Sequence, residues 1–83
     1  MKLRVHVRVI PRPTLLDPQG QAIEHALTAL GFAGVGEVRV GKAIELGVEA
    51  ASPDEAEASV RRMCEQLLAN PVTEDFQIEV EAR

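Results

Sequence analysis

The first nine residues alternate between apolar and polar side chains. The apolar residues lie two positions apart: Leu3, Val5, Val7 and Val9. The residues between them are basic: Lys2, Arg4, His6 and Arg8. Because successive side chains of a β-strand point to opposite faces, this pattern predicts a strand with one face buried and the other open. Pro11 and Pro13 cannot donate a backbone hydrogen bond, so the strand is expected to end there.

The next segment has the start and stop signals of a helix. Asp17 offers a side-chain acceptor for an N-cap, and Pro18 stands at the first helical position. Apolar residues then recur at helical spacing as far as Leu30, and Gly31 suits a left-handed C-terminal cap. These signals predict a helix over 18–30.

Two short alternating runs follow, one at Val38 and Val40 and the other over 44–48. Gly41-Lys42 lies between them, and a two-residue Gly-X link is typical of a type II′ hairpin. The pattern therefore predicts two strands joined by a tight turn.

The last third predicts a helix and a strand. Ser52-Pro53-Asp54-Glu55 is a capping box with proline at the first helical position. An apolar stripe that includes Val60, Cys64 and Leu67 follows, and the helix is expected to end near Ala69 because Asn70 precedes Pro71. The residues from Phe76 to Val80 alternate again and predict a closing strand.

The predicted order is strand, helix, strand, strand, helix, strand. It indicates one α+β domain over 1–83 with a ferredoxin-like βαββαβ fold, in which two helices cover one face of a four-stranded antiparallel sheet. The first and last strands are then neighbours. Arg4 and Arg8 are expected opposite Glu79 and Glu81 on the uncovered face.

Composition excludes several classes of function. No apolar run approaches the roughly 18 residues of a membrane span, and one cysteine among 83 residues fits a reducing, cytoplasmic setting. Two aromatic residues leave little for base stacking, so nucleic-acid binding is not expected.

The sequence offers little for catalysis. His6 and His25 have no metal-ligand spacing, and surface positions are expected for both. Cys64 shares its helical stripe with apolar residues, which indicates a buried thiol. We therefore expect no catalytic, cofactor-binding or metal-binding residues in this chain.

Several blocks of sequence carry a more specific signal. They are Leu16-Asp17-Pro18-Gln19-Gly20, Val38-Arg39-Val40-Gly41-Lys42, and Leu67-Leu68-Ala69-Asn70-Pro71-Val72. In order and spacing they resemble the PurS family, the small subunit of phosphoribosylformylglycinamidine (FGAM) synthase of purine biosynthesis.

The resemblance implies a non-catalytic subunit of an ATP-dependent carbon–nitrogen ligase. Such a subunit bridges a glutaminase (PurQ type) and a synthetase (PurL type) and assists the transfer of ammonia from glutamine to formylglycinamide ribonucleotide. The complex is expected to use ATP and Mg²⁺, neither of which is bound by the small subunit. The small subunit itself is expected to be a homodimer or homotetramer. An alternative of the same topology is an amino-acid-sensing regulatory module. The sheet edge or face that pairs, and the path of the ammonia, stay open.

Eight residues are candidates for contact with a partner, because they lie at turns, caps or exposed tips. They are Arg12, Asp17, Gln19, Gly20, Arg39, Lys42, Asn70 and Pro71. Folding alone explains Gln19 and Lys42 least, so these two are the stronger candidates.

Overall fold

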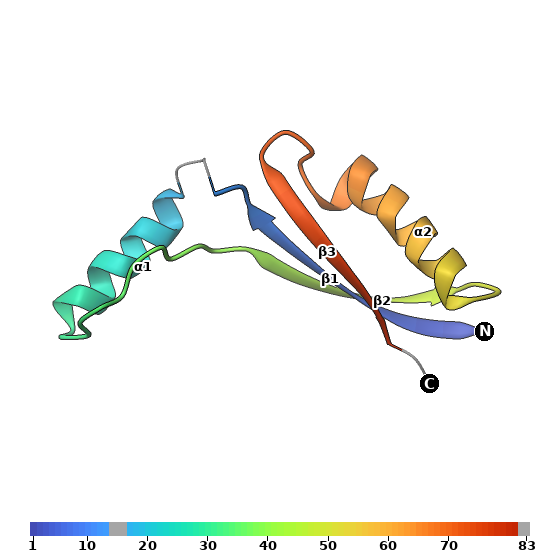
Figure 1. Cartoon of the computed structure of the whole chain (residues 1–83), viewed down its shortest axis with the longest axis horizontal. Coiled ribbons are helices and arrows are strands. Elements are labelled where there is room, and N and C mark those ends of the chain that lie inside the picture. The colour runs from blue at the N-terminus through green and yellow to red at the C-terminus, as the bar shows by residue number, and fades with distance from the viewer. Residues whose placement is uncertain (14–16, 82–83) are drawn as a thin grey trace.

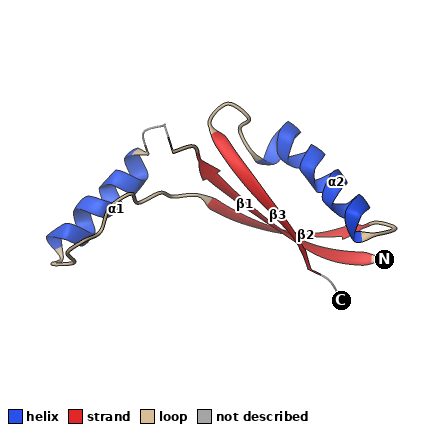
Figure 2. Ribbon diagram, viewed as in Figure 1, coloured by secondary structure: helices blue, strands red, loops and turns tan. Residues whose placement is uncertain are grey.

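A computed structural model of the chain describes residues 1–13 and 17–81, so Leu16 of the first motif lies outside the described part. The elements follow the chain as β1, α1, β2, α2, a π-helical turn η1 and β3 (Figures 1 and 2). Their bounds are β1 Lys2–Pro11, α1 Pro18–Ala29, β2 Lys42–Glu49, α2 Pro53–Met63, η1 Cys64–Leu68 and β3 Glu74–Glu81.

The three strands form one antiparallel sheet in the order β2-β1-β3. Val5 lies opposite Leu46 of β2 and Val80 of β3, so the apolar residues of all three strands share one face. The predicted first and last strands are therefore confirmed as neighbours. Arg4 lies opposite Glu81 as expected, whereas Arg8 lies opposite Gln77.

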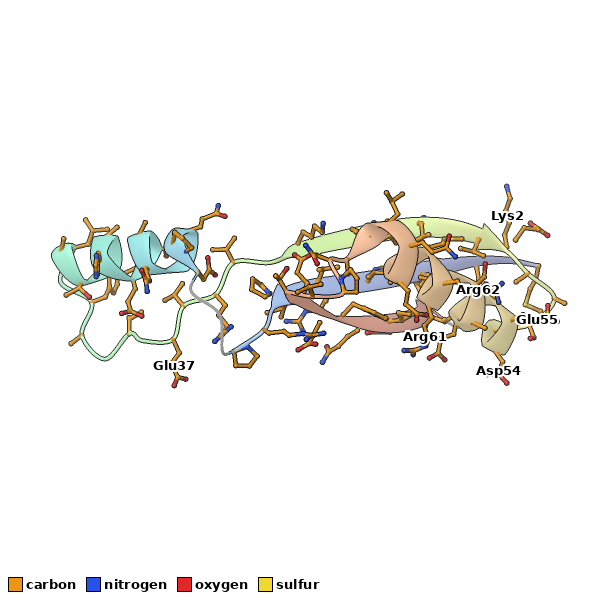
Figure 3. The ribbon with its side chains drawn as sticks, turned by 90° about the horizontal axis from the view of Figure 1, so that it is seen from above. Lys2, Glu37, Asp54, Glu55, Arg61 and Arg62 are labelled. Carbon is orange, nitrogen blue, oxygen red and sulfur yellow. The ribbon has the colours of Figure 1, made fainter. Side chains whose placement is uncertain are left out.

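The apolar face of the sheet packs against α2 and η1, which Figure 3 shows lying over the strands. The buried side chains are all apolar: Leu3, Val5, Val7, Val9, Val48, Ala56, Val60, Cys64 and Ala69. Within residues 1–13 and 17–81 no polar or charged side chain is buried. The hydrophobic effect is thus the main force that joins α2 to the sheet.

The predicted helix signals act as expected. Asp17 accepts a hydrogen bond from the amide of Gly20, and Ser52 Oγ accepts one from the amide of Glu55. Gly31 has φ +98°, a left-handed conformation that suits glycine after a helix.

The end of the second helix differs from the prediction. The last turn is a π-helix, in which the amide of Ala69 bonds to the carbonyl of Cys64 at 3.0 Å. An i→i+5 turn shifts the faces of a helix, so Leu67 leaves the apolar stripe and is 82% exposed, while Ala69 is buried.

Two helices were expected on the sheet, but in the described part of one chain only α2 lies there. α1 projects away from the sheet, on the same side as α2, and the molecule measures 50 × 28 × 14 Å (Figure 1). Its radius of gyration is 16.2 Å, whereas a compact chain of this length has about 12 Å. The only buried residue of α1 is Gly20. The predicted four-stranded sheet with two helices on one face is therefore wrong for a single copy of this chain.

The predicted hairpin at Gly41-Lys42 is also wrong. A type II′ turn needs a positive φ at Gly41, but the only glycines with positive φ are Gly31 and Gly34 among the described residues. Instead, the chain runs straight from the extended segment 38–41 into β2 (Figure 1). A straight chain keeps Val38 and Val40 in the same alternation as Ile44, whereas a two-residue hairpin would put them on the opposite face.

None of the described helices is both long and apolar enough to cross a membrane.

Candidate functional site

The projecting part of the molecule, which we call the arm, consists of α1 and the return segment, residues 17–41. One carboxylate joins its two halves. Asp17 Oδ1 accepts a hydrogen bond from the Gly20 amide at 2.9 Å, and Oδ2 accepts one from the Val40 amide at 2.8 Å. The bond from Gly20, and then that from Val40, hold the pKa of Asp17 below its usual value. The start of α1 is therefore fixed to the return segment.

Two glycines allow close approach of the backbone at the base of the arm. A Cβ on Gly20 would overlap the Val38 carbonyl, and a Cβ on Gly41 would overlap the Val9 carbonyl. Both positions therefore require glycine, because any side chain would collide with the carbonyl. The arm is thus packed backbone to backbone where it joins the sheet.

Arg39 ties the arm to the end of β1. Its Nη1 donates to the carbonyl of Pro11 at 3.0 Å, and its Nη2 donates to the carbonyl of Pro13 at 2.7 Å. A planar guanidinium can donate two such bonds at once. Arg39 therefore sets the direction of the arm and has only part of its donors left for a partner.

Arg12 joins the same end of β1 to the turn before β3. Its Nη2 donates to the Pro71 carbonyl at 2.7 Å, and its Nε lies 3.3 Å from Asp75 Oδ1. Asn70 shapes this turn, since its Oδ1 accepts from the amide of Val72 and its backbone amide donates to Glu74 Oε1. Arg12, Asn70 and Pro71 thus form one cluster, which we call the corner.

The two strongest candidates lie apart from these clusters. Gln19 is exposed in the first turn of α1, and Lys42 is exposed at the first position of β2, opposite Val9. Across the described ranges neither side chain has a hydrogen bond or ion pair. Both can therefore bind a partner without breaking a contact of the fold.

The structure brings together six of the eight predicted contact residues along the strand end Pro11–Pro13: the corner on one side and the base of the arm, Asp17, Gly20 and Arg39, on the other. A hollow of about 200 Å³ lies beside it, with Ile10 and Phe76 among its lining. Asp75, whose Oδ1 lies 3.3 Å from Arg12 Nε, was not among the residues predicted from the sequence. Its position directly before the predicted closing strand was the available signal.

The groups with reactive side chains are separate from this region. His6 lies on the open face of the sheet, with Nδ1 3.1 Å from Glu45 and Nε2 3.1 Å from Glu81. Cys64 is fully buried, and burial raises the pKa of its thiol, so the thiolate that would act as a nucleophile is disfavoured. Within the described part of the chain, no three His, Cys, Asp or Glu side chains are placed to hold a metal ion.

Comparison with known proteins agrees with this arrangement. The family model of PurS, described as phosphoribosylformylglycinamidine (FGAM) synthase, matches residues 4–82. A PurS subunit of that synthase from Synechocystis is 49% identical, with 95% of this chain and 77% of the relative aligned. The PurS subunit from Bacillus subtilis is 45% identical, with 94% and 92% aligned.

Solved structures give the same result. The chain is similar to a crystal form of Bacillus subtilis PurS, with a TM-score of 0.85, 44% identity, and 99% of this chain and 100% of that one covered. It is also similar to a chain in the structure of PurLQS from Thermotoga maritima, with a TM-score of 0.89, 33% identity, and 98% and 99% covered. Sequence and fold together show that the chain belongs to the PurS family.

Proposed function

We propose that this chain is the non-catalytic subunit of an FGAM synthase, an ATP-dependent ligase that uses glutamine as the amide donor. Its role is to bridge a PurL-type synthetase and a PurQ-type glutaminase, and to assist the passage of ammonia between them. The observation that carries the proposal is the match to the PurS family over residues 4–82, together with PurS subunits aligned over nearly the whole chain. The structure of PurLQS from Thermotoga maritima, which contains a similar chain, supports the choice of partners.

The chemistry of ammonia transfer explains why such a subunit needs no reactive residues. Ammonia reacts as a nucleophile only while it is neutral, and a path closed to bulk water keeps it from being protonated or lost. A small protein that holds two larger ones together can supply this closure by contact alone. ATP and Mg²⁺ would be bound by the synthetase, with none bound by this chain, and the complex would work in the cytoplasm.

The subunit is proposed to act as a homodimer or homotetramer. The four-stranded ferredoxin-like sheet expected from the sequence would then form between copies, with the extended residues 38–41 as its additional strand. A second copy would also cover apolar side chains of the arm such as Ile23 and Leu30, which are 40% and 75% exposed.

Reconstitution tests the bridging role. The chain alone is expected to show neither glutaminase nor amidation activity. Added to a synthetase and a glutaminase of this family, it should restore glutamine-dependent turnover and change ammonia-dependent turnover much less. Equal glutamine-dependent activity with and without the chain would show that it does not bridge the two.

Lys42→Glu tests the contact surface. Lys42 is exposed and unpaired in the described structure, so its reversal should leave the fold intact and weaken co-purification with the two partners. Lys2→Glu is the matched control, since Lys2 is an exposed lysine at the opposite end of β1 (Figure 3). Undiminished assembly of the Lys42 variant would remove this residue from the contact surface.

A further inference from the structure

The open face of β1 changes from polar to apolar beside the arm. The residues that alternate with the buried valines along β1 are Lys2, Arg4, His6, Arg8 and Ile10. Ile10 is the apolar member of this series and is half buried. It lies against the base of the arm, because a Cβ on Gly41 would be 3.2 Å from Ile10 Cγ1. The end of the open face therefore offers a partner apolar contact that the rest of the face does not.

Ile10 lines the hollow of about 200 Å³ beside the strand end, and the other apolar residues of its lining are Pro11, Pro13 and Phe76. Small-molecule sites occupy roughly 300–1,000 Å³, so this hollow is too small for most metabolites. Side chains that anchor a protein interface are commonly seated in small apolar pockets of this kind. The size and lining therefore suit one apolar side chain of another protein.

Two arginines at the hollow leave positive charge beside its apolar lining. Arg8 is exposed, and within residues 1–13 and 17–81 it has no hydrogen bond or ion pair. The residues opposite it on β2 and β3 are uncharged. Arg39 uses only two of its N–H donors, on backbone carbonyls, so other donors remain for a ligand. Asp75, the acidic residue of the lining, is paired with Arg12 at 3.3 Å and does not neutralise Arg8.

We infer that the hollow is a docking site for an acidic segment of a partner subunit, the synthetase or the glutaminase. One apolar side chain of the segment fills the hollow, and a neighbouring carboxylate pairs with Arg8 and with the remaining donors of Arg39. The inference rests on the proposed function, which supplies the partner. The hollow lies between the corner and the base of the arm, so docking there brings most of the predicted contact residues to one interface.

Arg8→Gln tests the charged half of the site, because it removes the charge and keeps a long polar side chain. The Kd for the synthetase and glutaminase together is expected to rise about tenfold at low salt. The difference from the unaltered chain should shrink as salt is added, since salt screens exposed charges. Arg62→Gln is the matched control and should leave the Kd unchanged, because Arg62 is an exposed arginine of α2, on the other side of the sheet (Figure 3).

Ile10 tests the apolar half of the site. Ile10→Gln keeps a side chain of similar length but makes it polar, and should raise the Kd about tenfold at every salt concentration, because loss of apolar contact is not screened. Ile10→Val removes a single carbon and is the milder variant in case the first one unfolds. It should raise the Kd by up to about fourfold. Melting curves of the isolated variants show that each is folded before binding is measured.

The outcomes separate this inference from the proposed function. An unchanged Kd for Arg8→Gln or for folded Ile10→Gln, or an equal rise with Arg62→Gln, would overturn the inference and leave the bridging role intact. Fewer chains per particle for Arg8→Gln in light scattering would show that a second copy occupies the hollow, and would also overturn it. Absence of binding by the unaltered chain would overturn the proposed function itself.

Discussion

The π-helical end of α2 makes a quantitative prediction about Val60 and Leu67. Val60 is fully buried against the valines of β1, so Val60→Ala removes two buried methyl groups and leaves a cavity. At about 0.8 kcal/mol for each group, plus a cavity term, the expected loss is about 2–3 kcal/mol. Leu67 is 82% exposed, and Leu67→Ala should change stability by less than about 0.5 kcal/mol.

The comparison separates a π-turn from a continuous α-helix. If η1 were α-helical, Leu67 would stay on the stripe of Val60, and its truncation would cost about 2–5 kcal/mol. Urea unfolding followed by circular dichroism, at equal chain concentration for both variants and the unaltered protein, measures the two losses. A loss for Leu67→Ala as large as that for Val60→Ala would refute the assignment of Leu67 to the surface.

Three further predictions concern the arm and the thiol. Gly20→Ala should lower the melting temperature, because overlap with the Val38 carbonyl costs about 1–3 kcal/mol and exceeds the helix preference of alanine, about 1 kcal/mol; Gly36→Ala, where a Cβ meets nothing within 4 Å, is the control. Asp17 has a lowered pKa in the fold, so its contribution to stability is present above the ordinary pKa of an aspartate, 3.8, and is lost as the pH falls through its folded pKa. Melting curves across this acid range should lose that part of the pH dependence in Asp17→Asn. Cys64, buried and with a raised pKa, should react with a disulfide reagent only in denaturant; rapid reaction of the native protein would contradict its burial.

Local signals predicted the elements well because they depend on neighbouring residues. The alternation from Leu3 to Val9 is enough for a strand with one buried face, and the caps at Asp17 and Ser52 need only the first turn of each helix. The π-turn could not be predicted in this way. The stripe through Cys64 fits an α-helix equally well, and the choice depends on how Ala69 reaches the core.

The position of the first helix could not be derived from its own residues. Its apolar stripe shows that it needs a surface to cover, but not in which chain that surface lies. The Gly41-Lys42 pair permits a tight turn without requiring one, since Gly41 is also explained by its contact with the Val9 carbonyl. The prediction of a four-stranded sheet within a single chain failed because Gly41-Lys42 does not form the turn.

The candidate site was predicted in part. Arg12, Asn70 and Pro71 were selected separately, and the structure joins them through one hydrogen bond and the turn that follows. The bonds of Arg39 were beyond sequence analysis, because its acceptors are backbone carbonyls 26 and 28 residues away. Every residue has a backbone carbonyl, so the residue types do not indicate which carbonyls Arg39 will bind.

The straight passage through Gly41 also bears on how fast subunits can mix. If each arm lies on the other copy's sheet, neither chain can change partner until both arms have been released, which amounts to partial unfolding of the pair. Native proteins of this size unfold on times from below a second to days, and finished pairs would retain their original chains for as long as this release takes. Particles that combine two different variants should therefore be prepared by refolding the chains together or by producing them in the same cell.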